Sequence, residues 1–240
     1  LTEKFTLLTS GQFSNTVYEK GQGLTLVNYQ VGGGSAGLGY QVTENTQMQL
    51  LGSYTQFRTI DTPTAFRASF PGINLSITHM FTESFTATFY GGPRFLSSTT
   101  QLSGDSITAN DTVWLFGGNI QKKFERSSIQ VAAARNVAPS GLGILIQSDR
   151  LSATMTHDFN ESVIASFDSS LIQVTNAGTR AGINVFDQLY FSATPKISWK
   201  FAEWWKLEFS YTYRWAQGVG TSPDVSSNGT MFTITYYPPK

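Results

Sequence analysis

Two histidines, His79 and His157, are the side chains of this chain best suited to acid–base chemistry near neutral pH. A hydrolase that used either of them would also need a serine and a carboxylate in matching positions. No such Ser, His and acid spacing stands out. Each histidine instead lies two residues before a phenylalanine, Phe81 or Phe159, at a predicted tight turn. We therefore predict amphipathic rim residues, no catalytic residue and no enzyme activity.

Composition narrows the class of protein. The 240 residues include 40% hydrophobic and 14% aromatic side chains, whereas only 13% are charged, against about 25% in soluble domains. No run of about 18 apolar residues exists, which excludes a transmembrane helix. Cysteine is absent, and we predict no metal site and no cofactor. The formal net charge is zero, which gives no argument for binding nucleic acid.

The segment 113–138 shows how the backbone that carries these residues is organised. Trp114, Phe116, Ile120 and Phe124 share one parity, and mostly polar residues occupy the other. Successive side chains of a strand point to opposite faces, so this segment predicts a β-hairpin with one apolar and one mostly polar face. The same alternation recurs along the chain and predicts about twelve strands.

Short turns alternate with longer polar loops between the predicted strands. The short turns are TENT (43–46), TES (82–84), ERS (125–127), NES (160–162) and AEW (202–204). The longer loops are predicted at 58–67, 98–111, 175–184 and 218–229. Bacterial outer-membrane barrels have short periplasmic turns, longer extracellular loops and an apolar band that faces lipid. The pattern therefore predicts an all-β, transmembrane, antiparallel up-and-down β-barrel in the bacterial outer membrane, with residues 1–240 as a single domain.

Two stretches near the start of the chain allow alternatives. Residues 1–22 are either the first strand with a loop or an N-terminal extension. Residues 24–42 form either one long strand that bends at Gly32, Gly33 and Gly34, or a separate short hairpin that turns there. The first residues, LTEKFTLL, lack the basic and apolar regions of a signal peptide, so we expect a mature or trimmed chain.

A soluble β-sandwich or barrel would show the same alternation, with the apolar face packed inside. Low charge, long strands and aromatic residues at the strand ends favour the membrane instead. We predict an aromatic girdle at the short turns, formed by Phe81, Phe85, Phe124, Phe159, Phe201 and Trp204. The expected surroundings are outer-membrane lipid and lipopolysaccharide.

If the apolar parity faces lipid, the opposite parity lines the lumen. Its predicted cations are Arg94, Lys123, Arg150, Lys196, Lys200, Lys206 and Arg214, and its acids are Asp158, Asp168 and Glu208. This excess of cations favours the passage of anions such as acidic sugars. The same charges could instead brace a closed barrel, with Lys206 beside Glu208 and Asp168 meeting Arg150. Side chains can fill or nearly fill a barrel of about twelve strands, so both interpretations stay open.

Residues 131–167 resemble part of the EpsL-like group, the outer-membrane β-barrels found with bacterial exopolysaccharide and PEP-CTERM/exosortase loci. The shared elements are a P-S-G-x-G loop, a D-R-L strand element and an N-E-S turn. They correspond here to Pro139, Ser140, Gly141, Gly143, Asp149, Arg150, Leu151, Asn160, Glu161 and Ser162. The resemblance covers under a fifth of the chain, and turn residues dominate it. It implies a role beside polysaccharide export, with periplasmic export proteins or other envelope subunits as partners.

Three functions are compatible with these patterns. The leading prediction is an outer-membrane channel or export component for polysaccharide or another anionic solute, without chemistry of its own. The alternative is a closed barrel that anchors a periplasmic or surface partner. The third is a phospholipase-type barrel enzyme. Such enzymes work at the outer leaflet, whereas His79 and His157 are predicted at the periplasmic rim.

Overall fold

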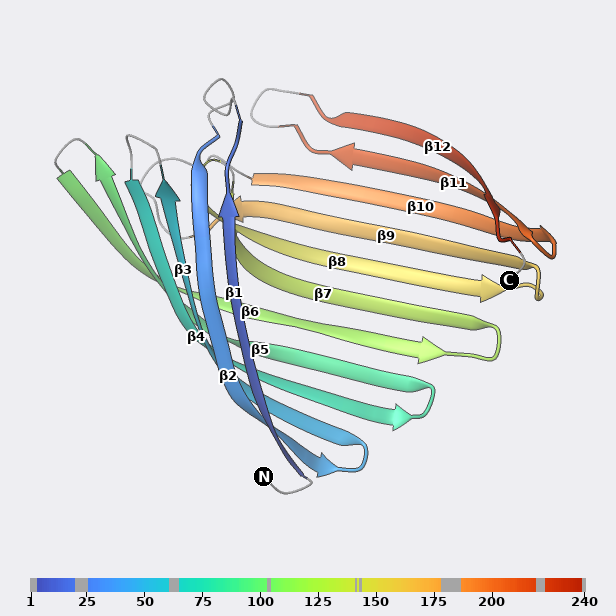
Figure 1. The fold of residues 1–240 in the computed structure, drawn as a ribbon, viewed down its shortest axis with the longest axis horizontal. Coiled ribbons are helices and arrows are strands. Elements are labelled where there is room, and N and C mark those ends of the chain that lie inside the picture. Colours follow the sequence, from blue (N-terminus) through green and yellow to red (C-terminus); the bar gives the residue numbers. More distant parts are fainter. Residues whose placement is uncertain are drawn as a thin grey trace.

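The chain forms one twelve-stranded antiparallel sheet in which each strand pairs with the next along the sequence (Figure 1). The computed structural model describes residues 4–19, 26–60, 65–102, 105–140, 142, 144–177, 187–218 and 223–238. In these ranges no helix is long and apolar enough to cross a membrane. The strands are β1 (Phe5–Thr16), β2 (Asn28–Thr43), β3 (Thr46–Ile60), β4 (Ala65–Thr82), β5 (Phe85–Leu102), β6 (Asp105–Lys123), β7 (Ser127–Pro139), β8 (Leu145–Asp158), β9 (Val163–Asn176), β10 (Asp187–Ala202), β11 (Trp205–Ala216) and β12 (Val225–Tyr236).

The predicted all-β, up-and-down order of twelve antiparallel strands is confirmed in the described residues. The stretch with three glycines belongs to one long strand, β2, which pairs with β1 on one side and β3 on the other. Several predicted features lie outside the described residues: 1–3 and 20–22 of the N-terminal region, 61–64, 178–184 and 219–222 of the longer loops, and Gly141 and Gly143.

The short turns lie between strands where the sequence predicts them, and they follow one another along one edge of the sheet (Figure 1). The loop predicted at 98–111 is wrong, because β5 continues to Leu102 and β6 begins at Asp105. Serine and threonine obscure the alternation there. Their hydroxyls pair across the strands, as Thr99 and Thr108 do at 3.2 Å, and threonine fits a pleated surface well. The loops predicted at 58–67 and 218–229 are shortened in the same way, since β4 begins at Ala65 and β12 at Val225.

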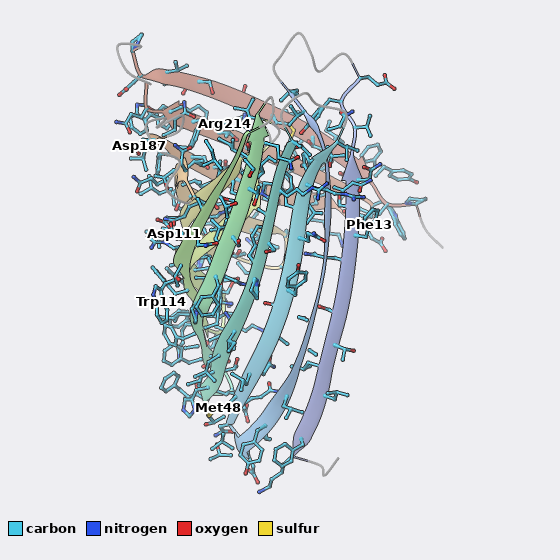
Figure 2. All side chains as sticks on the ribbon, turned by 90° about the vertical axis from the view of Figure 1, so that its left-hand side faces the viewer. Phe13, Met48, Asp111, Trp114, Asp187 and Arg214 are labelled. Atoms are coloured by element: carbon cyan, nitrogen blue, oxygen red, sulfur yellow. The ribbon has the colours of Figure 1, made fainter. Side chains whose placement is uncertain are left out.

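The registers keep most of the apolar residues on one side of the whole sheet. This apolar face carries Leu38, Leu50, Leu75, Phe89 and Phe116 with their register partners, and the opposite side is called the polar face. Trp114, Phe116 and Phe209 are 61%, 50% and 44% exposed. Side chains project from both sides of the sheet, and Trp114 points away from it (Figure 2). A soluble barrel with a packed apolar interior would have buried these three rings.

The glycine pair Gly117–Gly118 lets two aromatic rings cross the β5–β6 pair, one on each face. Phe89 lies over Gly118, where an added Cβ would fall 2.7 Å from the ring. Tyr90 lies over Gly117 on the polar face, where a Cβ would overlap its hydroxyl. The paired glycines therefore provide space for close packing of both rings.

The pairing of β6 with β7 is short, covering Gly117–Lys123 against Ser128–Ala134. Beyond this short stretch, β6 stays paired with β5 only, and β7 stays paired with β8 only. The far ends of β7 and β8 then pack against the polar face of β2–β5, around Phe57, whose side chain is fully buried. This apolar cluster comprises Phe57, Ala68, Phe70, Leu96 and Leu145, with Tyr29, Val31, Phe66, Val137 and Ala177 packed against it. The predicted mostly polar face therefore carries an apolar cluster at the loop end.

Candidate functional site

All ten charged residues predicted for the lumen share the polar face, nine according to the strand registers and Lys200 according to the alternation along β10 after Trp199. They come from six strands: Arg94 from β5, Lys123 from β6, Arg150 and Asp158 from β8, Asp168 from β9, and Lys196, Lys200, Lys206, Glu208 and Arg214 from β10 and β11. Half of them therefore lie on one strand pair. That this face lines a lumen stays a prediction.

The β10–β11 pair forms a cationic strip around Glu208. The Lys206 Nζ lies 3.0 Å from one carboxylate oxygen, and the Lys196 Nζ lies 3.9 Å from the other. The Ser198 hydroxyl donates a hydrogen bond of 3.1 Å to the same carboxylate. The Lys206–Glu208 contact agrees with the bracing interpretation. The Glu208 carboxylate nevertheless faces two lysine amines, so the positive charge around it exceeds the negative charge.

Two further cations extend the strip along the same strands. Lys200 and Arg214 are exposed on the polar face, and neither has an ion-pair partner within the described ranges. Arg214 is opposite Ser192 on one side and Ser227 on the other. Four cations and one acid therefore share the polar face of two adjacent strands. Such a strip raises the local concentration of anions.

The predicted contact between Asp168 and Arg150 is wrong. The β8–β9 register places Asp168 opposite Thr154, which donates a hydrogen bond of 2.8 Å to the carboxylate, and it places Arg150 opposite Ile172. Arg150, like Lys123 and Asp158, forms no ion pair in the part of the chain that the structure describes. Sequence spacing alone does not give the stagger between two strands, which decides these pairs.

Arg94 is half-buried, as Lys196 and Lys206 are, but it forms no ion pair in the described residues. Its guanidinium donates a hydrogen bond to the Ser53 hydroxyl, and its stem crosses Gly72, where an added Cβ would overlap it. Leu96, two residues further along β5, belongs to the apolar cluster. Arg94 therefore lies beside the base of that cluster. Ser53 and Gly72 were missed from sequence, because only the register brings them together.

The six predicted girdle residues lie at the short-turn end, on strand ends or in the turns. Phe81 and Phe85 stack with ring centroids 4.7 Å apart. Lys122, which sequence reasoning did not single out, extends its amine over Phe85 and Phe124 at 5.5 and 5.9 Å. A lysine amine above aromatic rings is typical of a side chain whose stem covers apolar surface while its charged end stays in water.

The two histidines lie on the apolar face at the same end. The His79 Nδ1 is hydrogen-bonded to the Thr46 hydroxyl at 2.8 Å, and the His157 Nδ1 to the Ser127 hydroxyl at 2.7 Å. Each ring also meets the following phenylalanine edge-on, at 4.5 and 4.7 Å. The same bond forms with a threonine hydroxyl at His79 and with a serine hydroxyl at His157. We infer that its role is to orient the imidazole ring. Among the described residues, no group of three or more His, Asp or Glu side chains could hold a metal ion.

No protein-family model and no curated protein matches this chain. Among solved structures, it is similar to the translocator domain of the autotransporter NalP from Neisseria meningitidis, at 12% identity and a TM-score of 0.43, over 97% of this chain and 87% of that one. It is also similar to OmpT, an outer membrane protein of Vibrio cholerae, at 11% identity and a TM-score of 0.38, over 98% and 97% of the two chains. The NanC porin is a third, at 10% identity and a TM-score of 0.36, over 97% and 99%. These likenesses are too remote to carry an argument about function.

Proposed function

We propose that this chain is a bacterial outer-membrane β-barrel channel that passes an anionic solute. The observation that carries the proposal is the cationic strip of β10 and β11, with Lys196, Lys200, Lys206 and Arg214 around a single acid, Glu208. A row of cations on the wall of a water-filled passage favours the entry of anions. Function, in this proposal, comes from the charge and shape of the inner wall.

The exposed apolar face supports a lipid environment. Soluble proteins rarely expose a contiguous apolar surface of this extent, and a bilayer removes its contact with water. A transmembrane strand needs about 9–11 residues when it is tilted, and even the shorter strands β1, β11 and β12 have 12. The short-turn end carries the aromatic rings, as the periplasmic rim of such a barrel does.

Pairing of β1 with β12 would complete the barrel. In the described residues these are the two edge strands, each with one partner. β1 begins opposite Tyr40 near one short turn, and β12 ends opposite Trp205 beside another. The two strands therefore run in opposite directions, as an antiparallel closure requires. Lipid cannot satisfy the backbone N–H and C=O groups of an open edge, so the membrane favours closure.

We further propose an acidic polysaccharide, or a similar anionic sugar, as the solute. The strip offers several cations along two strands, which suits a ligand with repeated carboxylates. The resemblance of residues 131–167 to barrels of polysaccharide-export loci is consistent with this class. Periplasmic export proteins are the partners that this role implies.

Ion selectivity in planar bilayers tests the proposal. The wild-type protein is expected to give discrete current steps and a reversal potential that favours chloride across a KCl gradient. The combined variant Lys196→Gln, Lys200→Gln and Arg214→Gln is expected to lose most of this preference. Lys122→Gln removes a cation from the apolar face and serves as the matched control, which should keep the wild-type reversal potential. A cation-selective wild type would overturn the proposed solute class.

The apolar cluster around Phe57 favours a second candidate, a closed barrel that anchors a partner. The cluster covers part of the polar face at the loop end, with β7 and β8 packed against β2–β5. If the protein inserts into vesicles, as measured by flotation, but gives no current steps, the anchoring function is supported and the channel is refuted. Both functions use the same membrane fold.

A further inference from the structure

The chain contains an internal repeat of one hairpin. Residues 77–89 read ITHMFTESFTATF and residues 155–167 read MTHDFNESVIASF, with seven of thirteen positions identical. The structure extends the similarity, because the register sets each histidine opposite an alanine: His79 opposite Ala87, and His157 opposite Ala165. Both histidines also accept or donate a hydrogen bond at Nδ1 to a hydroxyl on the preceding strand. Differences between the two copies are therefore informative.

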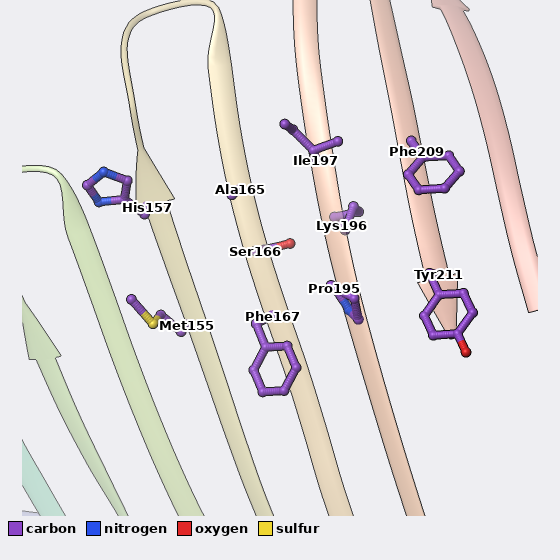
Figure 3. Close-up of a pocket in the computed structure, with 10 residues that line it drawn as sticks. All are labelled: Met155, His157, Ala165, Ser166, Phe167, Pro195, Lys196, Ile197, Phe209 and Tyr211. Atoms are coloured by element: carbon purple, nitrogen blue, oxygen red, sulfur yellow. The ribbon is translucent and has the colours of Figure 1, made fainter. Parts of the chain in front are cut away.

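The copies differ at the position two residues before the alanine. The first copy has Phe85, which stacks on Phe81, and Ala87 in this copy is only 4% exposed. The second copy has the smaller Val163 at the position of Phe85. A groove of about 380 Å³ lies on the apolar face of β8–β11 and includes Ala165, two residues along β9 from Val163 (Figure 3). Its walls include Met155, His157, Ala165, Phe167, Ile197 and Phe209.

This groove is mostly apolar, with Ser166, Lys196 and Tyr211 also in its lining, and its short-turn end is polar. His157 lines it, and because Ser127 holds the Nδ1 atom, the Nε2 atom stays available. Nε2 has no protein hydrogen-bond partner in the part of the chain that the structure describes. Arg126 precedes Ser127, and its carbonyl is bonded to the Asp158 amide at 2.7 Å, which fixes this turn beside His157. Glu161 lies on the β8–β9 turn at the same end.

We propose that the groove binds one zwitterionic glycerophospholipid of the periplasmic leaflet. One acyl chain lies along the apolar walls, since the volume equals about a dozen water-sized groups. The phosphate is bound by His157 and Arg126, and the headgroup ammonium by Glu161. This occupant matches the site because it combines an apolar chain with adjacent negative and positive groups. The inference rests on the proposed function, because it requires the apolar face to lie in a membrane.

Native mass spectrometry of the delipidated protein in detergent, titrated with dioleoyl phosphatidylethanolamine, tests the inference. The wild type is expected to bind one lipid in preference to further copies. Val163→Phe recreates the covered first copy and should weaken this first binding step at least tenfold. Val42→Phe adds the same ring to β2, a strand that does not line the groove, and should bind as the wild type does. Equal binding by the Val163→Phe variant would overturn the inference.

A second variant separates the polar end from the apolar walls. His157→Ala leaves the groove open and should weaken phosphatidylethanolamine binding severalfold, whereas His79→Ala in the covered copy should have no effect. Equal loss in both variants would refute the assigned headgroup contact. Flotation with vesicles and bilayer currents are measured on the same preparations. A protein that inserts and conducts but binds no lipid at this site refutes only the groove, whereas failure to insert refutes the membrane function itself.

Discussion

The substitution Phe57→Ala probes the apolar cluster, which decides whether the loop end of the sheet is a packed core. The Phe57 side chain is completely buried, and its ring lies 5.4 Å from that of Tyr29 and 5.8 Å from that of Phe66. Truncating a buried phenylalanine to alanine costs about 3–5 kcal/mol, through lost burial and the cavity left behind. The two ring pairs, each worth about 0.5–1.5 kcal/mol, place the expected loss near the upper part of that range.

Equilibrium unfolding in urea, followed by tryptophan fluorescence in lipid vesicles, measures this loss. Phe95→Ala is the matched control, because Phe95 precedes Leu96 of the cluster on β5 but lies on the apolar face and is 49% exposed. Its half-covered ring should cost only about 1–2 kcal/mol. If Phe57→Ala destabilised the protein no more than Phe95→Ala does, the cluster would not be a packed core.

The same variant has a second, independent readout. Removing the Phe57 ring leaves a void among side chains that cover the polar face, so single-channel conductance should rise. An unchanged conductance together with the expected loss of stability would show that the cluster packs beside the conducting path and does not narrow it.

Two further substitutions test contacts between neighbouring strands of the sheet. Gly92→Ala should destabilise the fold by at least about 3 kcal/mol, because the added Cβ would overlap the backbone carbonyl oxygen of Ile73, and the β4–β5 pairing would have to separate. Asp149→Asn should cost about 1–3 kcal/mol, because it breaks the bidentate pair with Arg135, whose bonds are 2.6 and 2.8 Å long and whose side chains are only about one third exposed. Urea unfolding measures both.

Each of these substitutions has a control within the chain. Gly52→Ala places a Cβ 3.7 Å from the nearest carbonyl oxygen, an ordinary contact, and should change stability by less than about 0.5 kcal/mol. Asp168→Asn keeps the acceptor for Thr154 and removes an exposed charge without an ion pair. Equal effects of Gly92→Ala and Gly52→Ala would contradict the close β4–β5 approach. Equal effects of the two aspartate changes would show that the Arg135 pair adds nothing to stability.

The strands, their two faces and the short turns were readable from sequence, because side-chain direction in a strand follows a local period of two. Trp114 and Phe116 are exposed on one face as that period predicts. Where serine and threonine fill both parities, as in 98–111, the period carries no signal, and the sequence predicts a loop where the structure has a hairpin. In that segment, the strand propensity of threonine is the only sequence feature that indicates β-structure.

Contacts between strands were decided by the tertiary structure alone. Asp168 meets Thr154 and not Arg150, and Arg94 meets Ser53, because these pairs depend on the stagger of neighbouring strands. The contact of Leu145 with Phe57 depends on how far β6 stays paired with β7 and on how strongly the sheet curls. The sequence by itself determines which side of each strand is apolar, since that property is local. The packing of the loop end and the open groove beside His157 arise only when distant strands come together.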